Sequence, residues 1–165
     1  MKRFLAAAIF VALIASVPSA AQADMFRLGL SIGEGMAING SSVSRIPVSL
    51  ELVPSLGWTW FKFDLGLYIT LEDLQAGNVA LDKNLTLRPG CRFTPTFMPL
   101  YFRFAVPLQV VNNFDVGFLF GLGVDFKLLG PLGIFGEVNT QLTNNFSWGS
   151  NGVPLDFHAG LRVAF

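Results

Sequence analysis

The last eleven residues of the chain, Leu155 to Phe165, alternate between apolar side chains and polar or small ones. Because successive side chains of a β-strand point to opposite faces, this spacing produces one apolar face and one face with Asp156, His158 and Arg162. A helix, with 3.6 residues per turn, would scatter the same side chains around its axis. The segment is therefore predicted to be an amphipathic strand that ends on an aromatic residue.

The same alternation recurs along the chain, and we predict eight strands from it. In the clearest case, Phe114 to Leu128, apolar residues fill every second position and Gly, Asp or Lys fill most of the others. After residue 24 no apolar stretch reaches the roughly 20 residues of a membrane helix, so the apolar residues are divided among short strands. The predicted strands are Met25–Gly33, Arg45–Val53, Gly57–Leu71, Asn84–Phe93, Leu100–Val110, Phe114–Leu128, Pro131–Thr143 and Val153–Phe165.

Within these predicted strands, the charged residues fall on the face opposite the apolar one. A charge on the lipid side of a barrel costs about 2–4 kcal/mol at the bilayer midplane, whereas charges in the lumen can pair with one another. The pattern predicts an all-β, closed, antiparallel, eight-stranded transmembrane up-and-down β-barrel. The alternative is a periplasmic sandwich with an apolar core, which would leave sheet edges that barrel closure removes.

Eight strands enclose a lumen just wide enough to be filled by side chains, so we expect a plugged interior with a polar network. Glycines on the same face, Gly117, Gly121 and Gly123, are expected to make room for long neighbouring side chains. The predicted network consists of Arg27, Arg45, Glu51, Lys62, Asp64, Arg88, Arg92, Arg103, Asp115, Asp125, Lys127, Glu137, Asp156, His158 and Arg162.

The predicted connections alternate in character, as they do in membrane barrels with short turns on one rim and longer loops on the other. Short or proline-bearing turns are expected at 53–56, 94–99 and 129–131, and longer loops at 34–44, 72–83 and 143–152. Trp58 and Trp60 share the polar parity of Lys62, so either a bulge turns them outward or both rings cap the lumen. The sequence leaves that choice open.

The N-terminus predicts export of the chain. Lys2 and Arg3 precede an apolar run, Phe4 to Val17, and the small-residue sequence Ala21-Gln22-Ala23 follows it. This is the pattern of a cleaved signal peptide, so we expect residues 1–23 to be removed and residues 24–165 to form the barrel. Nine of the eleven basic residues then remain against eleven acidic ones, which argues against nucleic-acid binding.

Few residues suggest chemistry beyond a structural network. His158 is the single histidine, and Asp156 on the same face could orient it as a general base, with Thr143, Ser147 or Ser150 as a nucleophile. A buried histidine with satisfied hydrogen bonds is the structural alternative. One histidine, one cysteine and scattered carboxylates lack ligand spacing, so we predict no metal and no cofactor.

With these features the chain resembles the small eight-stranded outer-membrane barrels of Gram-negative bacteria, the group that includes the OmpA transmembrane domain and OmpX. The resemblance implies location in the outer membrane and contact with its lipid and lipopolysaccharide. It also implies insertion of a monomer by the outer-membrane assembly machinery, with the help of periplasmic chaperones. The assembly signal implied by the resemblance is formed by Phe157, Ala159, Leu161, Val163 and Phe165.

Four functions remain open at this point. The leading hypothesis is a non-enzymatic barrel with a structural or surface-interaction role through its outer loops. A narrow channel for ions or small solutes is the second. A lipid-A-modifying enzyme using His158 is the third, since the resembling group includes such barrels, and a soluble lipocalin-like carrier is the fourth.

Overall fold

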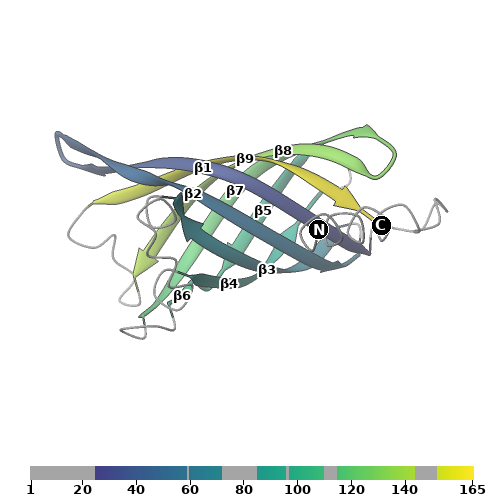
Figure 1. The fold of residues 1–165 in the computed structure, drawn as a ribbon, viewed down its shortest axis with the longest axis horizontal. Helices are drawn as coiled ribbons and strands as arrows, with labels where there is room; N and C mark the ends of the chain where they lie inside the picture. The colour runs from purple at the N-terminus through teal and green to yellow at the C-terminus, as the bar shows by residue number, and fades with distance from the viewer. Residues whose placement is uncertain (1–24, 59, 72–84, 96, 110–114, 144–151) are drawn as a thin grey trace, which may run out of the picture.

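The computed structural model describes residues 25–58, 60–71, 85–95, 97–109, 115–143 and 152–165. These residues form one antiparallel sheet that closes on itself into a barrel (Figure 1). The predicted signal peptide, residues 1–23, lies outside the described residues. The strands are β1 Phe26–Asn39, β2 Ser42–Gly57, β3 Phe61–Thr70, β4 Thr86–Phe93, β5 Leu100–Ala105, β6 Leu108–Gln109, β7 Asp115–Leu129, β8 Leu132–Thr143 and β9 Val153–Ala164.

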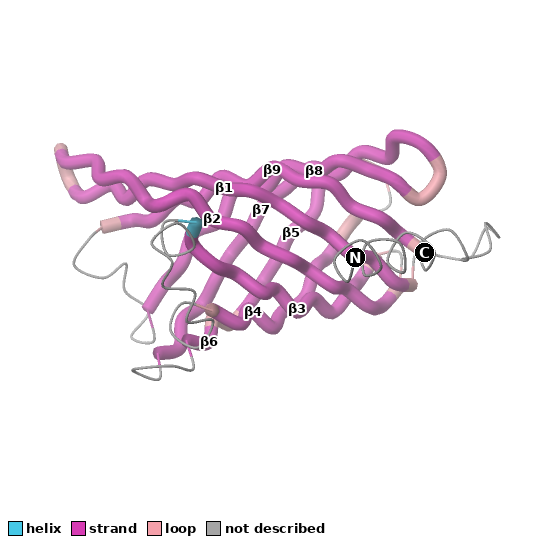
Figure 2. Tube along the Cα trace, in the orientation of Figure 1, coloured by secondary structure: helices cyan, strands magenta, loops and turns pink. Residues whose placement is uncertain are grey.

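Closure of the barrel follows from the pairing of its first and last strands. β1 pairs with β9, and every other pairing joins strands that follow one another around the barrel. β5 and β6 both pair with β4 and β7, so together they occupy one of eight strand positions. Figure 2 shows the tilted strands wrapping around a common axis. The predicted closed, eight-stranded, up-and-down β-barrel is confirmed.

The break between β5 and β6 lies at Val106 and Pro107. Proline has no backbone N–H to donate, which interrupts regular sheet bonding. The neighbouring bonds survive, because Val106 N donates to Pro89 O at 2.8 Å and Gly117 N donates to Pro107 O at 3.1 Å. The register with β4 and β7 is the same before and after the break. The interruption therefore leaves the barrel closed.

The first hairpin differs from the prediction. The sequence suggested a loop at 34–44, whereas β1 continues to Asn39 and β2 begins at Ser42. A tight turn at Gly40 and Ser41 joins them, and the φ of +58° at Gly40 is one that a residue without a side chain adopts readily. At the end opposite the termini this hairpin projects beyond the other strands (Figure 1).

The second turn also lies elsewhere than predicted. The sequence suggested a turn at 53–56, but β2 continues through Pro54 to Gly57. The next strand begins at Phe61, and Trp58 N donates to Phe61 O at 2.7 Å. The prediction placed a turn at Pro54 because proline is common in turns. Proline is also compatible with a strand, at a position where no ladder hydrogen bond from its backbone nitrogen is needed.

Inward and outward positions alternate along the strands. Inward side chains such as Arg103 and Glu51 are about 1% exposed, whereas the outward Leu161 is 63% exposed. The outward face is mainly apolar, so the usual distribution of a soluble protein is inverted. Among the residues described, no helix has the length and apolar character needed to cross a membrane.

Candidate functional site

The candidate site is the lumen, which is filled by polar and charged side chains. Alternation along tilted strands directs every second residue to the barrel axis, so charges from distant parts of the chain meet there. The buried polar side chains are Arg27, Ser31, Ser49, Glu51, Ser55, Lys62, Asp64, Arg88, Arg92, Arg103, Glu137, Asn139, His158 and Arg162.

Arg103 occupies the centre of this network. Its Nη2 donates to Glu51 Oε1 at 2.7 Å, and its Nη1 donates to Glu137 Oε1 at 3.0 Å. Its Nε lies 3.6 Å from Asp64 Oδ2. The planar guanidinium presents several N–H groups in a fixed arrangement, which allows one side chain to bridge carboxylates from three strands.

Two further arginines complete the central cluster. Arg92 Nε donates to Asp64 Oδ2 at 3.0 Å, and Arg88 Nη1 donates to Glu51 Oε2 at 3.4 Å. Three guanidinium groups therefore face three carboxylates, since Glu137 is the third acid. This pairing offsets the large desolvation penalty that an isolated charge would carry inside the barrel.

Tyrosine rings support the arginines of the cluster. The Arg88 guanidinium carbon lies 3.6 Å from the centre of the Tyr68 ring, and that of Arg92 lies 4.3 Å from the centre of the Tyr101 ring. Tyr101 also donates its hydroxyl to Glu137 Oε2 at 2.7 Å. Cation–π contact and the hydroxyl bond hold the charged groups in defined positions.

Glycines make room for these side chains, as the sequence suggested. A Cβ at Gly121 would lie 2.3 Å from Asn139 Oδ1 and 3.2 Å from Arg103 Cβ. A Cβ at Gly123 would lie 2.2 Å from the Tyr101 ring. Gly66 has the same role beside Glu51 and was not identified from the sequence, although it shares the inward parity of β3.

A second cluster lies at the end of the lumen near the termini. Arg27 and Arg162 both donate to the carboxylate of Asp125. The Arg27 guanidinium also lies 5.4 Å from the centre of the Phe135 ring. Lys62 is likewise inward and buried, and its Nζ donates to the carbonyl oxygen of Trp58 at 3.2 Å.

His158 lies toward the other end of the lumen. Its Nδ1 is 3.3 Å from Ser31 Oγ, and a Cβ at Gly33 would lie 2.6 Å from its ring. Asp156 is near this group, with Oδ2 3.9 Å from Arg88 Nη2. Ser31 was not identified from the sequence as a partner of His158, because only the β1–β9 register brings the two strands together.

The Ser31–His158 contact has the elements of a nucleophile and a base, but both residues are buried. Of the nucleophiles suggested by the sequence, Ser147, Ser150 and the side chain of Thr143 lie outside the described residues. The catalytic interpretation of His158 and Asp156 stays a prediction.

Arg45 was predicted in the lumen, and that prediction is wrong. Gly33 pairs with Ser49 but Gly35 pairs with Ile46, so β2 contains one extra residue at a bulge. A one-residue slip exchanges the inward and outward faces of a strand. Arg45 therefore lies on the exterior, where it pairs with Glu34. Glu34 itself was missed, because the predicted strand ended at Gly33.

Two other predicted network residues are not part of the buried clusters described above. Lys127 is exposed near the β7–β8 turn, where the register shifts again between Lys127 and Leu129. For Asp115, the backbone belongs to β7 but the side chain lies outside the described residues.

The open choice about the tryptophans is resolved for Trp60. Its ring lies 5.9 Å from the Phe61 ring and 6.2 Å from the Phe93 ring, centre to centre. Phe61 and Phe93 are paired residues on the outward parity of β3 and β4. Trp60 therefore joins exterior aromatic rings because the turn interrupts the strand alternation, and Trp58 is exposed in the same turn.

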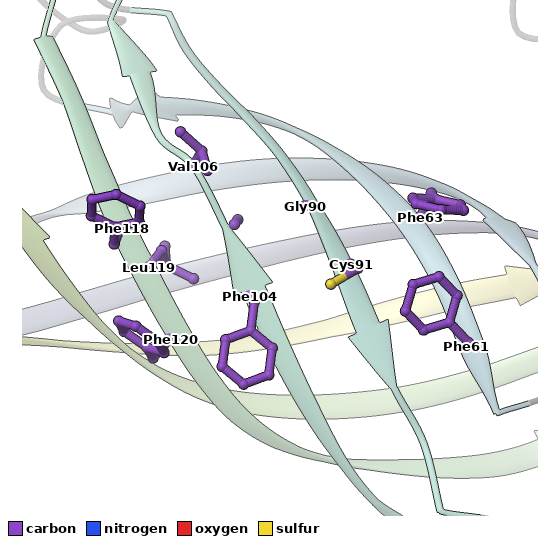
Figure 3. Close-up of a pocket in the computed structure, with 10 residues that line it drawn as sticks. Phe61, Phe63, Gly90, Cys91, Phe104, Val106, Phe118, Leu119 and Phe120 are labelled. Atoms are coloured by element: carbon purple, nitrogen blue, oxygen red, sulfur yellow. The ribbon is translucent and has the colours of Figure 1, made fainter.

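On the exterior, aromatic side chains surround a depression of about 340 Å³ (Figure 3). Its rim includes Phe61, Phe104 and Phe120, and the unpaired thiol of Cys91 faces it. Cys91 therefore lies in an apolar environment on the exterior of β4. Across the described ranges, no group of three or more histidine, cysteine, aspartate or glutamate residues could hold a metal ion.

No protein-family model matches the sequence, and no curated protein is significantly similar to it. A solved structure described as "De novo design of transmembrane beta-barrels" is similar in fold, with a TM-score of 0.49 and 12% sequence identity. The alignment covers 84% of this chain and 95% of the designed one.

Proposed function

We propose that this protein is a non-enzymatic outer-membrane barrel of a Gram-negative bacterium, with a lumen closed by its own side chains. Its role is structural, or interaction at the membrane surface through the connections at the barrel ends. The observation that carries the proposal is the inverted polarity of the barrel. Charged groups such as Arg103 and Glu51 are buried, whereas Phe63, Leu122 and Leu161 lie exposed on the outside.

The apolar exterior supports a lipid environment. Soluble monomers seldom expose apolar patches larger than a few hundred Å², whereas transmembrane barrels have an apolar band around their outer surface. Here exposed apolar side chains occur on strands all around the barrel, including Leu30, Phe63, Phe102, Phe120 and Leu161. A soluble carrier would have an apolar interior and a polar exterior, so the exposed apolar side chains disfavour that function.

The aromatic residues at the end near the termini support a membrane interface there. Trp60 packs with exterior phenylalanines, and the Phe26 and Phe165 rings stack with centres 5.9 Å apart. Aromatic girdles mark the interfaces of transmembrane barrels. Phe165 N also donates to Phe26 O at 2.8 Å, so the terminal residue takes part in closing the barrel.

The central cluster supports a closed lumen. Removing one partner of a buried ion pair costs about 3–5 kcal/mol, and Arg103 participates in several pairs at once. An open path would require these pairs to separate together. A narrow channel for ions or small solutes is therefore less favoured than a plugged barrel.

The proposal can be tested by refolding residues 24–165 from urea into dodecyl maltoside micelles and into phosphatidylglycerol vesicles. We expect a β-type circular dichroism spectrum, a shift in gel mobility on heating, and no conductance in planar bilayers above protein-free controls. A protein that stays soluble without detergent would contradict membrane insertion. Reproducible single-channel currents would favour the channel instead.

The non-enzymatic part needs a separate experiment. Lipid A from cells that overproduce the protein is expected to have an unchanged mass spectrum. The matched control is His158→Ala produced at the same level. A change in lipid A mass that disappears in His158→Ala would replace the structural role with an enzymatic one.

A further inference from the structure

Two charged side chains interrupt the apolar exterior where β1 meets β2. Glu34 lies between Ile32 and Met36 on the outward parity of β1, and the bulge brings Arg45 to the same face. Arg45 Nε donates to Glu34 Oε1 at 2.5 Å, while the side chains of Arg45 and Glu34 are 64% and 56% exposed. A charge facing lipid costs about 2–4 kcal/mol at the midplane but about 0–1 kcal/mol near an interface.

The position of the pair along β1 corresponds to such an interface. Glu34 follows Phe26, which stacks with Phe165 at the rim near the termini, by roughly eight residues at about 3.3 Å each. With a tilt of about 40°, the distance along the barrel axis is roughly 20 Å, against an apolar band of about 25 Å. The pair therefore lies near the opposite boundary of the band, at the depth of lipid headgroups.

At this level the exterior forms an open groove with a volume of about 520 Å³, within the range of sites for small ligands. Its polar lining residues are Glu34, Ser44 and Arg45, and its apolar lining residues are Met36, Val43 and Phe157. The two kinds of residue are neighbours, because Met36 pairs with Arg45 and Glu34 pairs with Phe157. A ligand that contacts both kinds of residue is amphipathic.

The chemistry of the polar lining residues favours a phosphate group. Glu34 occupies the Nε side of the Arg45 guanidinium, and within the described residues no protein group bonds to the two Nη atoms. These two N–H donors form a planar fork that matches phosphate oxygens. A second copy of this chain would have to supply another acid to the same fork, whereas lipid phosphates are abundant at this depth.

We propose that this groove binds an anionic phospholipid, with its phosphate on the Nη atoms of Arg45 and an acyl chain against Met36 and Phe157. The inference rests on the proposed insertion into a membrane. It adds a defined lipid site to an exterior that, over the described strands, is otherwise mainly apolar.

The test uses the protein in dodecyl maltoside, a detergent without phosphate or charge, titrated with dioleoyl phosphatidylglycerol and followed by native mass spectrometry. Arg45→Gln is expected to weaken retention of the first lipid about tenfold, the effect of losing a charge-assisted hydrogen bond. Arg45→Lys should give an intermediate value because lysine lacks the fork. Glu34→Gln should bind equally or more tightly, since the carboxylate repels phosphate.

The matched control is Lys127→Gln, which removes an exposed positive charge near the β7–β8 turn. Its binding should be unchanged. Equal weakening in Lys127→Gln and Arg45→Gln would reduce the effect to overall charge and overturn the site. Weakening in Glu34→Gln as strong as in Arg45→Gln would mean that the ion pair serves only the hairpin structure.

Further measurements distinguish the phospholipid from other ligands of the groove. Dioleoylglycerol, which has no phosphate, should be retained more weakly than the phospholipid, and equal retention would overturn the proposal. Competition by millimolar inorganic phosphate would indicate a free anion, and an Arg45-dependent dimer would indicate a second copy. The gel-mobility shift is measured first. If the wild type fails to insert, the proposed function is wrong; if it inserts and Arg45→Gln binds lipid normally, only this inference is wrong.

Discussion

Arg103 Nη2 donates to Glu51 Oε1 at 2.7 Å across the lumen, which connects β5 with β2 through side chains that are each 1% exposed. These strands are not neighbours in the barrel, so the contact spans the interior instead of following the sheet. Backbone ladders join each strand only to the next one. The ion pair therefore connects two strands that no backbone hydrogen bond joins.

Replacing Arg103 by methionine should destabilise the folded barrel by about 3–5 kcal/mol, because Glu51 and Glu137 would lose a buried partner. Urea unfolding in micelles, followed by circular dichroism, measures this free energy. Lys127→Met is the control, since it removes an exposed cation, and we expect a change within about 0.5 kcal/mol. Similar unfolding midpoints for both variants would show that the central cluster contributes no net stability.

Gly66→Ala should be destabilising by about 1–3 kcal/mol through overpacking. The new Cβ would lie 2.3 Å from Glu51 Oε1 and 2.7 Å from Arg103 Nη2. The matched control is Gly136→Ala, where the nearest heavy atom would be 3.8 Å away. Both variants can be compared by urea unfolding in the same detergent. Equal stability of the two would contradict a tightly filled lumen.

Phe120→Arg should impair insertion, since it places a charge on the exterior at a cost of about 2–4 kcal/mol near the membrane midplane. Insertion is measured as the fraction that shows heat-dependent gel mobility after refolding into vesicles. Phe120→Leu keeps an apolar side chain and should insert normally. Unimpaired insertion of Phe120→Arg would mean that this face does not contact lipid.

Deleting Phe165 should impair assembly in cells more than it reduces stability in detergent. The physical loss includes one aromatic side chain, roughly 1.5–3 kcal/mol, and its contact with Phe26. If the terminal aromatic is a signal for the assembly machinery, the amount of folded protein in the outer membrane should fall much further. Phe165→Tyr is the control that retains an aromatic ring. An assembly defect that only tracks detergent stability would remove the reason to call the terminus a signal.

The periodicity of the chain was sufficient to predict the fold and most of the inward-facing residues. Alternation is a property of each strand by itself, so Asp64, Arg92 and Glu137 could be assigned to the lumen without knowledge of their partners. The short turn at Gly130 also agrees with the prediction. So do the glycines that make room for inward side chains, Gly123 beside Tyr101 and Gly121 beside Asn139. In these cases local sequence and global fold depend on the same spacing.

Arg45 and Glu34 mark the limit of that reasoning. The local sequence around Arg45 determined only that this charge alternates with its neighbours. The β1–β2 register decided that Arg45 lies on the exterior, because β2 has one extra residue at a bulge. Likewise, the sequence determined that Ser31 and His158 face inward, while the closure of β1 against β9 brought them within 3.3 Å. Side-chain direction follows from the chain's local period, but contacts between strands depend on register, which is set by pairing over the whole barrel.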